Sequence, residues 1–559
     1  MPRFRKILVA AAWPYVNGSL HLGHVAGLLP ADIIARYHRQ HGDDVLFVSG
    51  SDCHGTPILN TAEKEGVSPQ VIAERYHQEA VDMLINRLGF SYSLYTKTMG
   101  DFHKSVAQTL FQEIYDNDCM VAKEEDQFFC VYCNRFLPDR FIEGTCPNCG
   151  ATGARGDQCD SCSKLHDAKD LLQPTCKICN NTPVLRRSKH LYFRLPLFQD
   201  RLDAWMLTVA DGWRENAITT TRSALLDQGL KDRPVTRDLS WGIPVPVEGF
   251  REKCIYVWFE AVMGYFSCSR EYSVLQNTPE AWRDWWENDQ AIHYYVHGKD
   301  NIPFHTIIWP AMLMALNLHL PDKIISSEYL NFEGLKFSKS KGIAIWLPEA
   351  LAKFDPETIR FYLTLNGPET KDVSFRWNDF RERVNADLIG TLGNFWQRTF
   401  AMITQNFDAI PSLQDYPADN HGTTLLQKAA TTFEIVSQAI EQGNLRTALS
   451  EVLDLAKAGN IYLNQREPWK MAKTNRNHAG ISLAVCAAIG DALRRLVAPF
   501  IPQPIERLNS YLGTTDLTWR FAPYHLGGKQ IIPPSVLIRK IEKETIKEEI
   551  DKMQRADSD

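Results

Sequence analysis

The sequence predicts an α/β protein with a doubly wound parallel sheet, a cysteine-rich insertion within that sheet and an α-helical bundle after it. Three observations lead to this prediction: an apolar strand, helix and strand pattern at the start of the chain, four Cys-x-x-Cys pairs between Cys130 and Cys179, and helical periodicity from about Val384 onward. Strands that alternate with helices build parallel sheets that are covered on both faces.

The first strand is expected at Lys6–Ala12, where apolar residues follow one another without a break. A helix-like segment through Tyr37 and a second strand at Asp44–Val48 come next. In a parallel sheet of this kind, ligands bind beyond the carboxyl ends of the strands. Four polar side chains follow the two strands and are therefore expected to gather at one edge of the sheet: His21, His24, Asp52 and His54.

Later segments resume this pattern and then end it. Apolar runs at Cys254–Phe259 and Ile292–His297 are interpreted as further strands of the interrupted sheet. From about Val384 the apolar residues recur with helical spacing, for example in Leu425–Gln442, and few strand signals remain. These features predict a separate helical bundle that ends in a Lys- and Glu-rich tail from Val536.

The composition is typical of a globular protein of several domains: 559 residues, of which 44% are hydrophobic and 23% charged. No apolar run approaches the ~20 residues of a membrane-spanning helix, so no membrane partner is expected. The net charge of −6 neither indicates nor excludes nucleic-acid binding, because local basic patches act independently of the total. Thirteen cysteines, mostly in pairs, favour a reducing compartment, and the cytoplasm is the expected location.

The cysteine pairs predict two structural zinc ions. Each Cys-x-x-Cys turn can present two thiolates to one tetrahedral ion, and a full set of four ligands leaves no open position for catalysis. The two inner pairs are expected to share one ion and the two outer pairs the other, although the spacing permits other pairings. Disulfides or free core cysteines are the alternatives for these eight residues: Cys130, Cys133, Cys146, Cys149, Cys159, Cys162, Cys176 and Cys179. The other five cysteines are expected to be plain buried residues: Cys53, Cys119, Cys254, Cys268 and Cys486.

Two short motifs indicate phosphate binding. In HLGH the spacing places His21 and His24 on one side of a helical turn, and Gly23 lets a flat ring or a phosphate approach the backbone. The helix N-terminus would add amide donors and a favourable dipole for anions. The basic segment Lys336–Gly342 can bring ammonium groups to a phosphate chain. Each motif alone is also compatible with an ordinary histidine pair or a solvated loop.

Together and in this order, HLGH and KFSKS resemble the two signatures of class I aminoacyl-tRNA synthetases. The resemblance to methionyl-tRNA synthetases extends over nearly the whole chain, through AAWPYVNGSLHLGH, SGSDCHGTP, RDLSWGIPVP, YVWFEAVMGY, HGKDNIPFH, NADLIGTLGNF and REPW. Two positions depart from the family pattern: Phe337 stands where methionine is commonest, and Val262 where some members have proline. Phe337 is expected to pack inward, and Val262 to alter the pocket shape slightly.

The resemblance implies a two-step reaction on a Rossmann-like catalytic sheet with a zinc-knuckle insertion and an α-helical anticodon-binding bundle. Methionine and ATP with Mg²⁺ form methionyl-adenylate and pyrophosphate, and methionine then passes to the 2′-hydroxyl of the terminal adenosine of tRNA(Met). Four catalytic residues would hold the phosphates or close over them: His21, His24, Lys336 and Lys339. Gly23, Asp300, Ser338 and Ser340 are the further residues expected to bind ATP, with Asp300 on the ribose.

Other positions acquire a role only through the resemblance. The methionine ammonium group is expected to meet Asp52, and the thioether to meet aromatic surface. The residues implied for this pocket are Ala12, Trp13, Tyr15, Asp52, Trp258, Tyr265 and His305. Arg237 is a possible substrate contact, and the residues expected to read the CAU anticodon are Asn394, Arg398 and Trp469. Without the resemblance, Trp258 and Trp469 would be interpreted as packing residues and Arg237 as an ion-pair partner.

The predicted domains are a first catalytic half (1–117), a connective zinc-knuckle insertion (118–232), a second catalytic half (233–325), a KFSKS and stem-contact region (326–388) and the anticodon-binding bundle with its tail (389–559). Another class I synthetase, for leucine, isoleucine, valine or cysteine, is the first alternative. A non-catalytic zinc-ribbon RNA-binding protein is the second, but such a module needs neither signature. Since the chain stops without the C-terminal domain that dimerises many family members, a monomer is expected.

Overall fold

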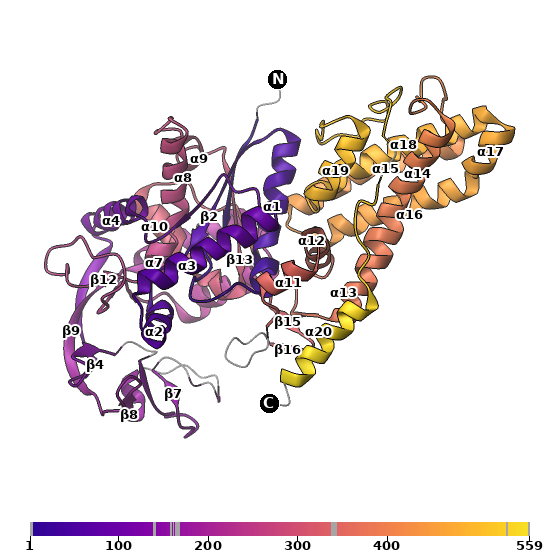
Figure 1. The fold of residues 1–559 in the computed structure, drawn as a ribbon. Coiled ribbons are helices and arrows are strands. Elements are labelled where there is room, and N and C mark those ends of the chain that lie inside the picture. The colour runs from indigo at the N-terminus through magenta and orange to yellow at the C-terminus, as the bar shows by residue number, and fades with distance from the viewer. Residues whose placement is uncertain are drawn as a thin grey trace.

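The computed structural model describes residues 4–137, 141–156, 159, 161–162, 168–336, 344–532 and 535–556. Figure 1 shows an α/β lobe formed by the earlier part of the chain and a helical lobe formed by the later part. A five-stranded sheet in the order β14-β13-β1-β2-β3 lies at the centre of the α/β lobe, and every neighbouring pair in it is parallel. Its strands are β1 (Lys6–Ala11), β2 (Asp44–Ser51), β3 (Leu94–Lys97), β13 (Ile292–Gly298) and β14 (Lys323–Ser327).

Both faces of this sheet are buried, as a doubly wound fold requires. Alternate side chains of a strand point to opposite faces, so Ile7 and Val9 join one apolar cluster while Leu8 and Ala10 join another. The first face is covered by α1 (Leu22–His41), and the second by α4 (Asp101–Asp116), α8 (Gly264–Leu275) and α10 (Trp309–Leu316). The predicted fold class is confirmed.

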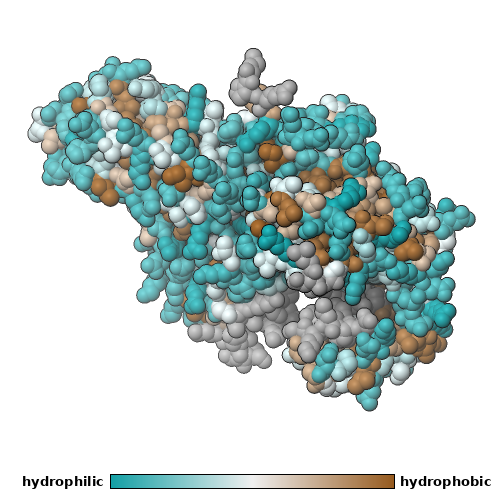
Figure 2. All heavy atoms as spheres, turned by 180° about the vertical axis from the view of Figure 1, so that it is seen from behind, coloured by the Kyte–Doolittle hydropathy of each residue, from teal (hydrophilic) through white to brown (hydrophobic). Residues whose placement is uncertain are grey.

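The insertion between β3 and β13 is more regular than its sequence indicates. Two long strands, β4 (Met120–Cys130) and β9 (Val184–Phe193), form an antiparallel ribbon that carries the small sheet β7-β6-β8 at its far end. The strands of that sheet are β6 (Ile142–Thr145), β7 (Ala154–Arg155) and β8 (Leu172–Cys176). Figure 2 shows the coloured part of the insertion from behind, at the lower right of the molecule. The ribbon was not predicted, because its alternation is broken by charged residues on both faces.

One predicted strand is wrong. Only Cys254–Ile255 is extended (β12), and it pairs with β11 (Thr236–Arg237) outside the central sheet. The rest of the apolar run Cys254–Phe259 lies in helix α7 (Val257–Ala261). A short apolar run does not distinguish a buried strand from a buried helix. The other helices of the α/β lobe are α2 (Thr56–Glu65), α3 (Pro69–Val81), α5 (Gln199–Val209), α6 (Glu215–Arg222) and α9 (Arg283–Trp286).

The later part of the chain is helical, as predicted. After α11 (Leu347–Lys353), α12 (Pro356–Leu365) and α13 (Trp377–Arg383), the bundle consists of α14 (Asn394–Asn406), α15 (Asn420–Glu441), α16 (Leu445–Arg466), α17 (Pro468–Thr474), α18 (Arg476–Val497) and α19 (Pro502–Leu512). The tail forms α20 (Lys543–Ala556), which returns along α13 toward β15 (Leu330–Phe332) and β16 (Leu335–Lys336) (Figure 1). Within the described ranges, no helix has the length and apolar character needed to cross a membrane.

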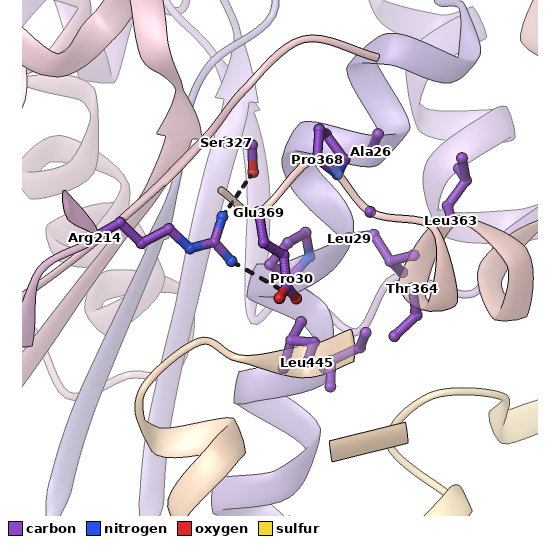
Figure 3. A pocket seen from close by; sticks show the side chains of 12 residues that line it. Ala26, Leu29, Pro30, Arg214, Ser327, Leu363, Thr364, Pro368, Glu369 and Leu445 are labelled. Carbon is purple, nitrogen blue, oxygen red and sulfur yellow. Dashed lines mark hydrogen bonds and ion pairs between the residues drawn. The ribbon is translucent and has the colours of Figure 1, made fainter. Parts of the chain in front are cut away.

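The two lobes meet at the edge strand β14. Arg214, at the start of α6, donates to Ser326 O at 3.2 Å and to Gly443 O, in the turn between α15 and α16, at 2.7 Å. Figure 3 shows its guanidinium group pointing toward Ser327 and Glu369 in the small pocket at this joint. Gly443 has φ +72°, and a Cβ atom there would stand 2.6 Å from Ile325. The helical turn therefore packs directly against the sheet that carries the candidate site.

Candidate active site

A cavity of about 310 Å³ opens at the carboxyl ends of β1, β13 and β14 and at the N-terminus of α1. Its lining brings together residues that stand far apart in the sequence: Ala12, Trp13, Pro14, His21, Gly23, His24, Gly27, Leu28, His297, Gly298, Asp300, Asn301, Ser327, Glu328, Tyr329 and Leu330. Six of the predicted site residues line this one cavity. This is the edge of the sheet at which the parallel fold predicts a ligand.

The two histidines of HLGH cap α1 as well as facing the cavity. His21 is the N-cap residue, and its Nδ1 accepts the backbone N–H of Gly23 at 3.1 Å. His24, three residues later, accepts the backbone N–H of His21 through its own Nδ1 at 3.0 Å. Because each Nδ1 accepts a hydrogen bond, the proton of each neutral ring is on Nε2. Both histidines line the cavity at the end of the helix, where the amide groups and the helix dipole favour anions.

Asp300 also lines the cavity, directly after the carboxyl end of β13. The Tyr329 hydroxyl donates to its carboxylate. Nearby, Lys299 Nζ lies 2.7 Å from a Glu328 oxygen and 2.9 Å from Asp372 Oδ1, and 4.0 Å from the centre of the Tyr329 ring. Burial and the Asp300 carboxylate raise the pKa of Tyr329, so its hydroxyl stays protonated and remains a donor. Tyr329 and Glu328 were not found by sequence reasoning, since neither belongs to a recognised motif.

Two of the residues expected to bind methionine, Ala12 and Trp13, line this cavity, and the others lie beside it. The indole Nε1–H of Trp258 donates to the Tyr15 hydroxyl, and the Trp258 ring packs edge-on against Phe304 with centroids 4.7 Å apart. The Trp13 ring lies between two glycines, because Cβ atoms at Gly50 and Gly264 would stand 2.4 Å and 2.7 Å from it. These close approaches explain why both positions lack a side chain.

His305 and Tyr265 form a buried pair in the same region. His305 donates from Nδ1 to Asn301 O at 2.9 Å, and the Tyr265 hydroxyl lies 2.8 Å from His305 Nε2. Burial lowers the pKa of His305 to about 4, so the ring is neutral near pH 7 and its Nε2 accepts a hydrogen bond from the Tyr265 hydroxyl. His297 stacks on His305 with centroids 4.1 Å apart, and burial lowers its pKa well below the usual range. The pocket wall is therefore uncharged at this point.

Asp52, unlike His297 and His305, is buried close to a second ionisable group, the carboxyl group of Glu260. It follows β2 directly, pairs with Tyr15 as a parallel bridge, and accepts the backbone N–H of His54 through Oδ1 at 3.3 Å. Burial, and then the negative charge of Glu260, raise the pKa of Asp52 well above its usual value. A cation bound beside Asp52 would offset this cost by stabilising the ionised carboxylate.

Glu260 is a residue that sequence reasoning missed. Its side chain is fully buried, and its two oxygens lie 2.6 Å from His54 Nδ1 and 2.7 Å from His103 Nε2. Burial alone would raise the pKa of Glu260, but the two imidazoles lower it, so the carboxyl group is ionised. The available signal was one acidic residue inside the apolar segment YVWFEAV.

Several predicted residues are only partly described or lie away from the cavity. Lys336 ends the short strand β16, and only its backbone is described. Ser338, Lys339 and Ser340 lie outside the described residues. Arg237 does not line the cavity: its guanidinium group lies 4.2 Å from the centre of the Tyr256 ring and donates to Thr236 O at 3.0 Å.

The eight paired cysteines form two clusters. Within each cluster the four Sγ atoms all lie within 4.8 Å of one another: Cys130, Cys133, Cys176 and Cys179 in one, and Cys146, Cys149, Cys159 and Cys162 in the other. The inner and outer pairs are thus grouped as predicted. The sulfur atoms of Cys130 and Cys179 are 3.4 Å apart, too far for the ~2.05 Å bond of a disulfide. Each cluster is able to hold one ion, and four thiolates around a point are the usual donor set of structural zinc. The other five cysteines are buried, as predicted.

The three residues expected at the anticodon lie together on the bundle. The Arg398 guanidinium group lies 5.4 Å from the centre of the Trp469 ring, and Trp469 is 37% exposed. Arg398 donates to Asn464 Oδ1 at 2.8 Å, and Asn394 Nδ2 lies 3.5 Å from Asn460 Oδ1. Asn460 and Asn464 stand four residues apart on α16 and so present these acceptors on one face of the helix.

Comparisons with known proteins agree with this geometry. Residues 7–400 match the family model "tRNA synthetases class I (M)", and residues 413–557 match "Anticodon binding domain of methionyl tRNA ligase". A methionine–tRNA ligase of Thermomicrobium roseum is 42% identical over 97% of this chain and 97% of its own length. One from Streptococcus pneumoniae is also 42% identical, over 99% of both chains.

The fold agrees as well. A Mycobacterium tuberculosis methionyl-tRNA synthetase bound by methionyl-adenylate superposes with a TM-score of 0.78 at 23% identity, over 96% of this chain and 100% of that one. The alternatives based on leucine, isoleucine, valine or cysteine enzymes, or on a non-catalytic zinc protein, are not supported by these matches. The chain belongs to the methionyl-tRNA synthetase family of class I aminoacyl-tRNA synthetases.

Proposed function

We propose that this chain is a methionine–tRNA ligase that activates methionine with ATP and transfers it to tRNA(Met) for initiation and elongation of translation. The observation that carries the proposal is the 310 Å³ cavity, where the HLGH histidines, Asp300 and the Ala12–Trp13 segment meet. A site of this size, with anion donors on one wall and a carboxylate on the other, fits a nucleotide beside a small amino acid.

The first step joins the methionine carboxylate to the α-phosphate of ATP. One carboxylate oxygen forms a bond to phosphorus, the bond from phosphorus to the bridging oxygen breaks, and pyrophosphate leaves with the electron pair. Such a displacement needs alignment and stabilisation of charge more than covalent help. The Nε2–H groups of His21 and His24 would donate to the phosphate oxygens as negative charge moves onto the leaving group.

Other residues would complete the nucleotide site. Gly23 would leave space for the adenine ring next to the helix end, and Asp300 would accept hydrogen bonds from the ribose hydroxyl groups. By family resemblance, Lys336 and Lys339 would close over the phosphates, with Ser338 and Ser340 binding ATP in the same segment. Mg²⁺ bound with ATP would supply further neutralisation of the phosphate charge.

Methionine would bind beside the nucleotide, with its ammonium group at Asp52. Trp13, Tyr15, Trp258 and Tyr265 would surround the thioether with aromatic surface, which favours sulfur over a branched aliphatic chain. His305 would hold Tyr265 in place rather than contribute charge, since its ring is neutral. Ala12 would contribute backbone contacts. Arg237, whose guanidinium group lies against the Tyr256 ring outside the cavity lining, is kept as a proposed substrate contact on family resemblance alone.

The two cysteine clusters would hold one structural zinc ion each. Eight thiols close together on short turns repel one another once ionised, and a metal ion removes this cost. With four sulfur ligands, neither ion would have an open position, so zinc would stabilise the insertion and leave the chemistry to the cavity.

In the second step, Asn394, Arg398 and Trp469 would read the CAU anticodon while the tRNA end enters the cavity. The terminal 2′-hydroxyl oxygen would form an ester bond to the methionyl carbonyl carbon and lose its proton, and AMP would leave as the bond from that carbon to its phosphate oxygen breaks. We propose that the five predicted domains (1–117, 118–232, 233–325, 326–388 and 389–559) carry these separate parts of the reaction. A monomer acting in the cytoplasm is the form of the protein that we propose.

Pyrophosphate exchange tests the assignment directly. The purified chain should exchange labelled pyrophosphate into ATP when methionine is present, and leucine, isoleucine, valine or cysteine should support at most a small fraction of that rate. Exchange that depends on one of those four amino acids and not on methionine would refute the proposal.

A further inference from the structure

The loop that carries Asp52 is held from behind by a group of buried polar side chains. Glu260 of α7 accepts hydrogen bonds from His54, in the loop between β2 and α2, and from His103 of α4. His103 continues the group, because its Nδ1 lies 2.7 Å from Ser267 Oγ of α8. One carboxylate thus ties together three elements that are far apart in the sequence.

His54 connects this group to Asp52 itself. Its side chain contacts Glu260, while its backbone N–H donates to Asp52 Oδ1. The residue between them, Cys53, is fixed on both sides: its N–H donates to Thr98 Oγ1 at 2.9 Å, and its carbonyl oxygen accepts from Trp241 Nε1 at 2.7 Å. The position of the Asp52 carboxylate is therefore set by a loop whose side-chain anchors are buried.

Two carboxylates share this dry region, and no lysine or arginine is hydrogen-bonded to either among the described residues. Negative charge that is kept out of water is costly unless it is paired. The imidazoles pair with Glu260, whereas Asp52 receives one backbone N–H. A cationic group beside Asp52 would gain from both negative charges, because electrostatic interactions are weakly screened in a buried site.

We propose that Glu260 is a positioning residue of the ammonium subsite: through His54 it fixes the Asp52 carboxylate, and its own charge strengthens the attraction for the substrate's α-ammonium group. The inference rests on the proposed function, in which Asp52 meets that ammonium group. Glu260 does not touch the substrate in this arrangement, since both of its oxygens are occupied by imidazoles.

The test is pyrophosphate exchange with Glu260→Gln in the full chain. Glutamine has the same shape but no charge, and it offers one acceptor oxygen for two imidazoles. Loss of one charge-assisted hydrogen bond corresponds to roughly a tenfold to hundredfold change. The KM for methionine should rise by about this factor, while the KM for ATP should stay within about twofold.

Two inhibitors distinguish an effect on the ammonium subsite from an effect on the whole methionine pocket. Methioninol keeps the ammonium group and lacks the carboxylate, whereas the deamino analogue of methionine keeps the carboxylate and lacks the ammonium group. Glu260→Gln should weaken the binding of methioninol by the same factor as the binding of methionine, and it should leave the binding of the deamino analogue unchanged. Equal weakening of both inhibitors, or of neither, would overturn the inference.

Matched variants keep the result interpretable. His54→Asn retains an amide N–H near the position of Nδ1 and should preserve the affinity for methionine. His54→Ala removes the hydrogen bond to Glu260 and should raise the KM for methionine as Glu260→Gln does. This pair tests the same link if Glu260→Gln does not fold. Glu357→Gln is the control, because Glu357 is equally buried but pairs with Arg507 in the other lobe. It should lower thermal stability without changing the KM for methionine. A wild-type chain that exchanged only with another amino acid would instead refute the proposed function.

Discussion

His24 uses its two ring nitrogens for different tasks, and a pair of substitutions can separate them. Nδ1 accepts the His21 backbone N–H at 3.0 Å and so completes the cap of α1. Nε2 is the remaining donor of a residue that lines the cavity. In His24→Asn the side-chain oxygen stands near the position of Nδ1, and nothing replaces Nε2. In His24→Ala both groups are lost.

The two losses differ in size. A lost capping contact costs about 1 kcal/mol of stability. A donor that acts on charge developing in the transition state contributes about 3–4 kcal/mol, or a factor of about 10²–10³ in kcat. His24→Asn should therefore melt like the wild type while its pyrophosphate-exchange kcat falls by about 10²–10³. His24→Ala should show the same fall in kcat and, in addition, reduced thermal stability.

The assay is pyrophosphate exchange at saturating ATP and methionine, combined with thermal melting of the same preparations. The KM for methionine should change little in both variants, because the lost contact acts on the phosphates in the transition state. Near-normal exchange by His24→Asn would show that Nε2 does not take part in the reaction. Reduced melting of His24→Asn would show that the cap depends on the imidazole ring itself.

Three further predictions concern the metal clusters, the bundle and the core. Cys146→Ser should leave one zinc ion per chain instead of two by metal analysis; two retained ions would contradict the four-thiolate site. Trp469→Ala should lower tRNA charging by about one to two orders of magnitude, the worth of one base–aromatic stack, with exchange near normal; equal losses in both assays would indicate a packing role. Asp32 is fully buried, and although burial raises its pKa, Arg36 and Arg360 lower it from 3.8 to about 2. Its pairing should stabilise the fold by about 2 kcal/mol above pH 4, and denaturant titrations should show that contribution disappearing as the pH falls toward 2 in the wild type but not in Asp32→Asn.

Three strands of the central sheet, β1, β2 and β13, were predicted because they carry strong local signals, whereas β3 and β14 were not predicted. The run from Lys6 is apolar on both faces, since β1 lies in the middle of the sheet and is covered twice. The segment Cys254–Phe259 has a similar composition, yet only two of its residues are extended. Whether such a run becomes strand or helix depends on the neighbours that it meets, and these are distant in the sequence. The β4–β9 ribbon was missed for a different reason, because charged residues break its alternation of polar and apolar side chains.

The candidate site also contains residues that could be predicted from the sequence and residues that could not. HLGH and the cysteine pairs are local patterns that the sequence shows directly, although the spacing left more than one pairing of the cysteines open. Glu260 meets His54 and His103 only after the chain has folded, across separations of 206 and 157 residues. Tyr329 likewise reaches Asp300 from another strand end. One sequence contains no signal for such pairs beyond the oddity of a charged residue in an apolar segment.

The capping geometry also explains why the motif needs histidine at both positions. In the proposed role, a side chain there accepts a backbone N–H close to the helix and, at the same time, presents a donor farther out, toward the phosphates of ATP. Asparagine can supply only the nearer atom, and glutamine, serine or threonine can supply only one of the two at the correct distance. Imidazole has nitrogens at both distances, and the hydrogen bond at Nδ1 forces the proton onto Nε2. The backbone that begins α1 thus fixes the protonation of the groups proposed to bind ATP, and a substitution that preserves the helix does not by itself preserve the chemistry.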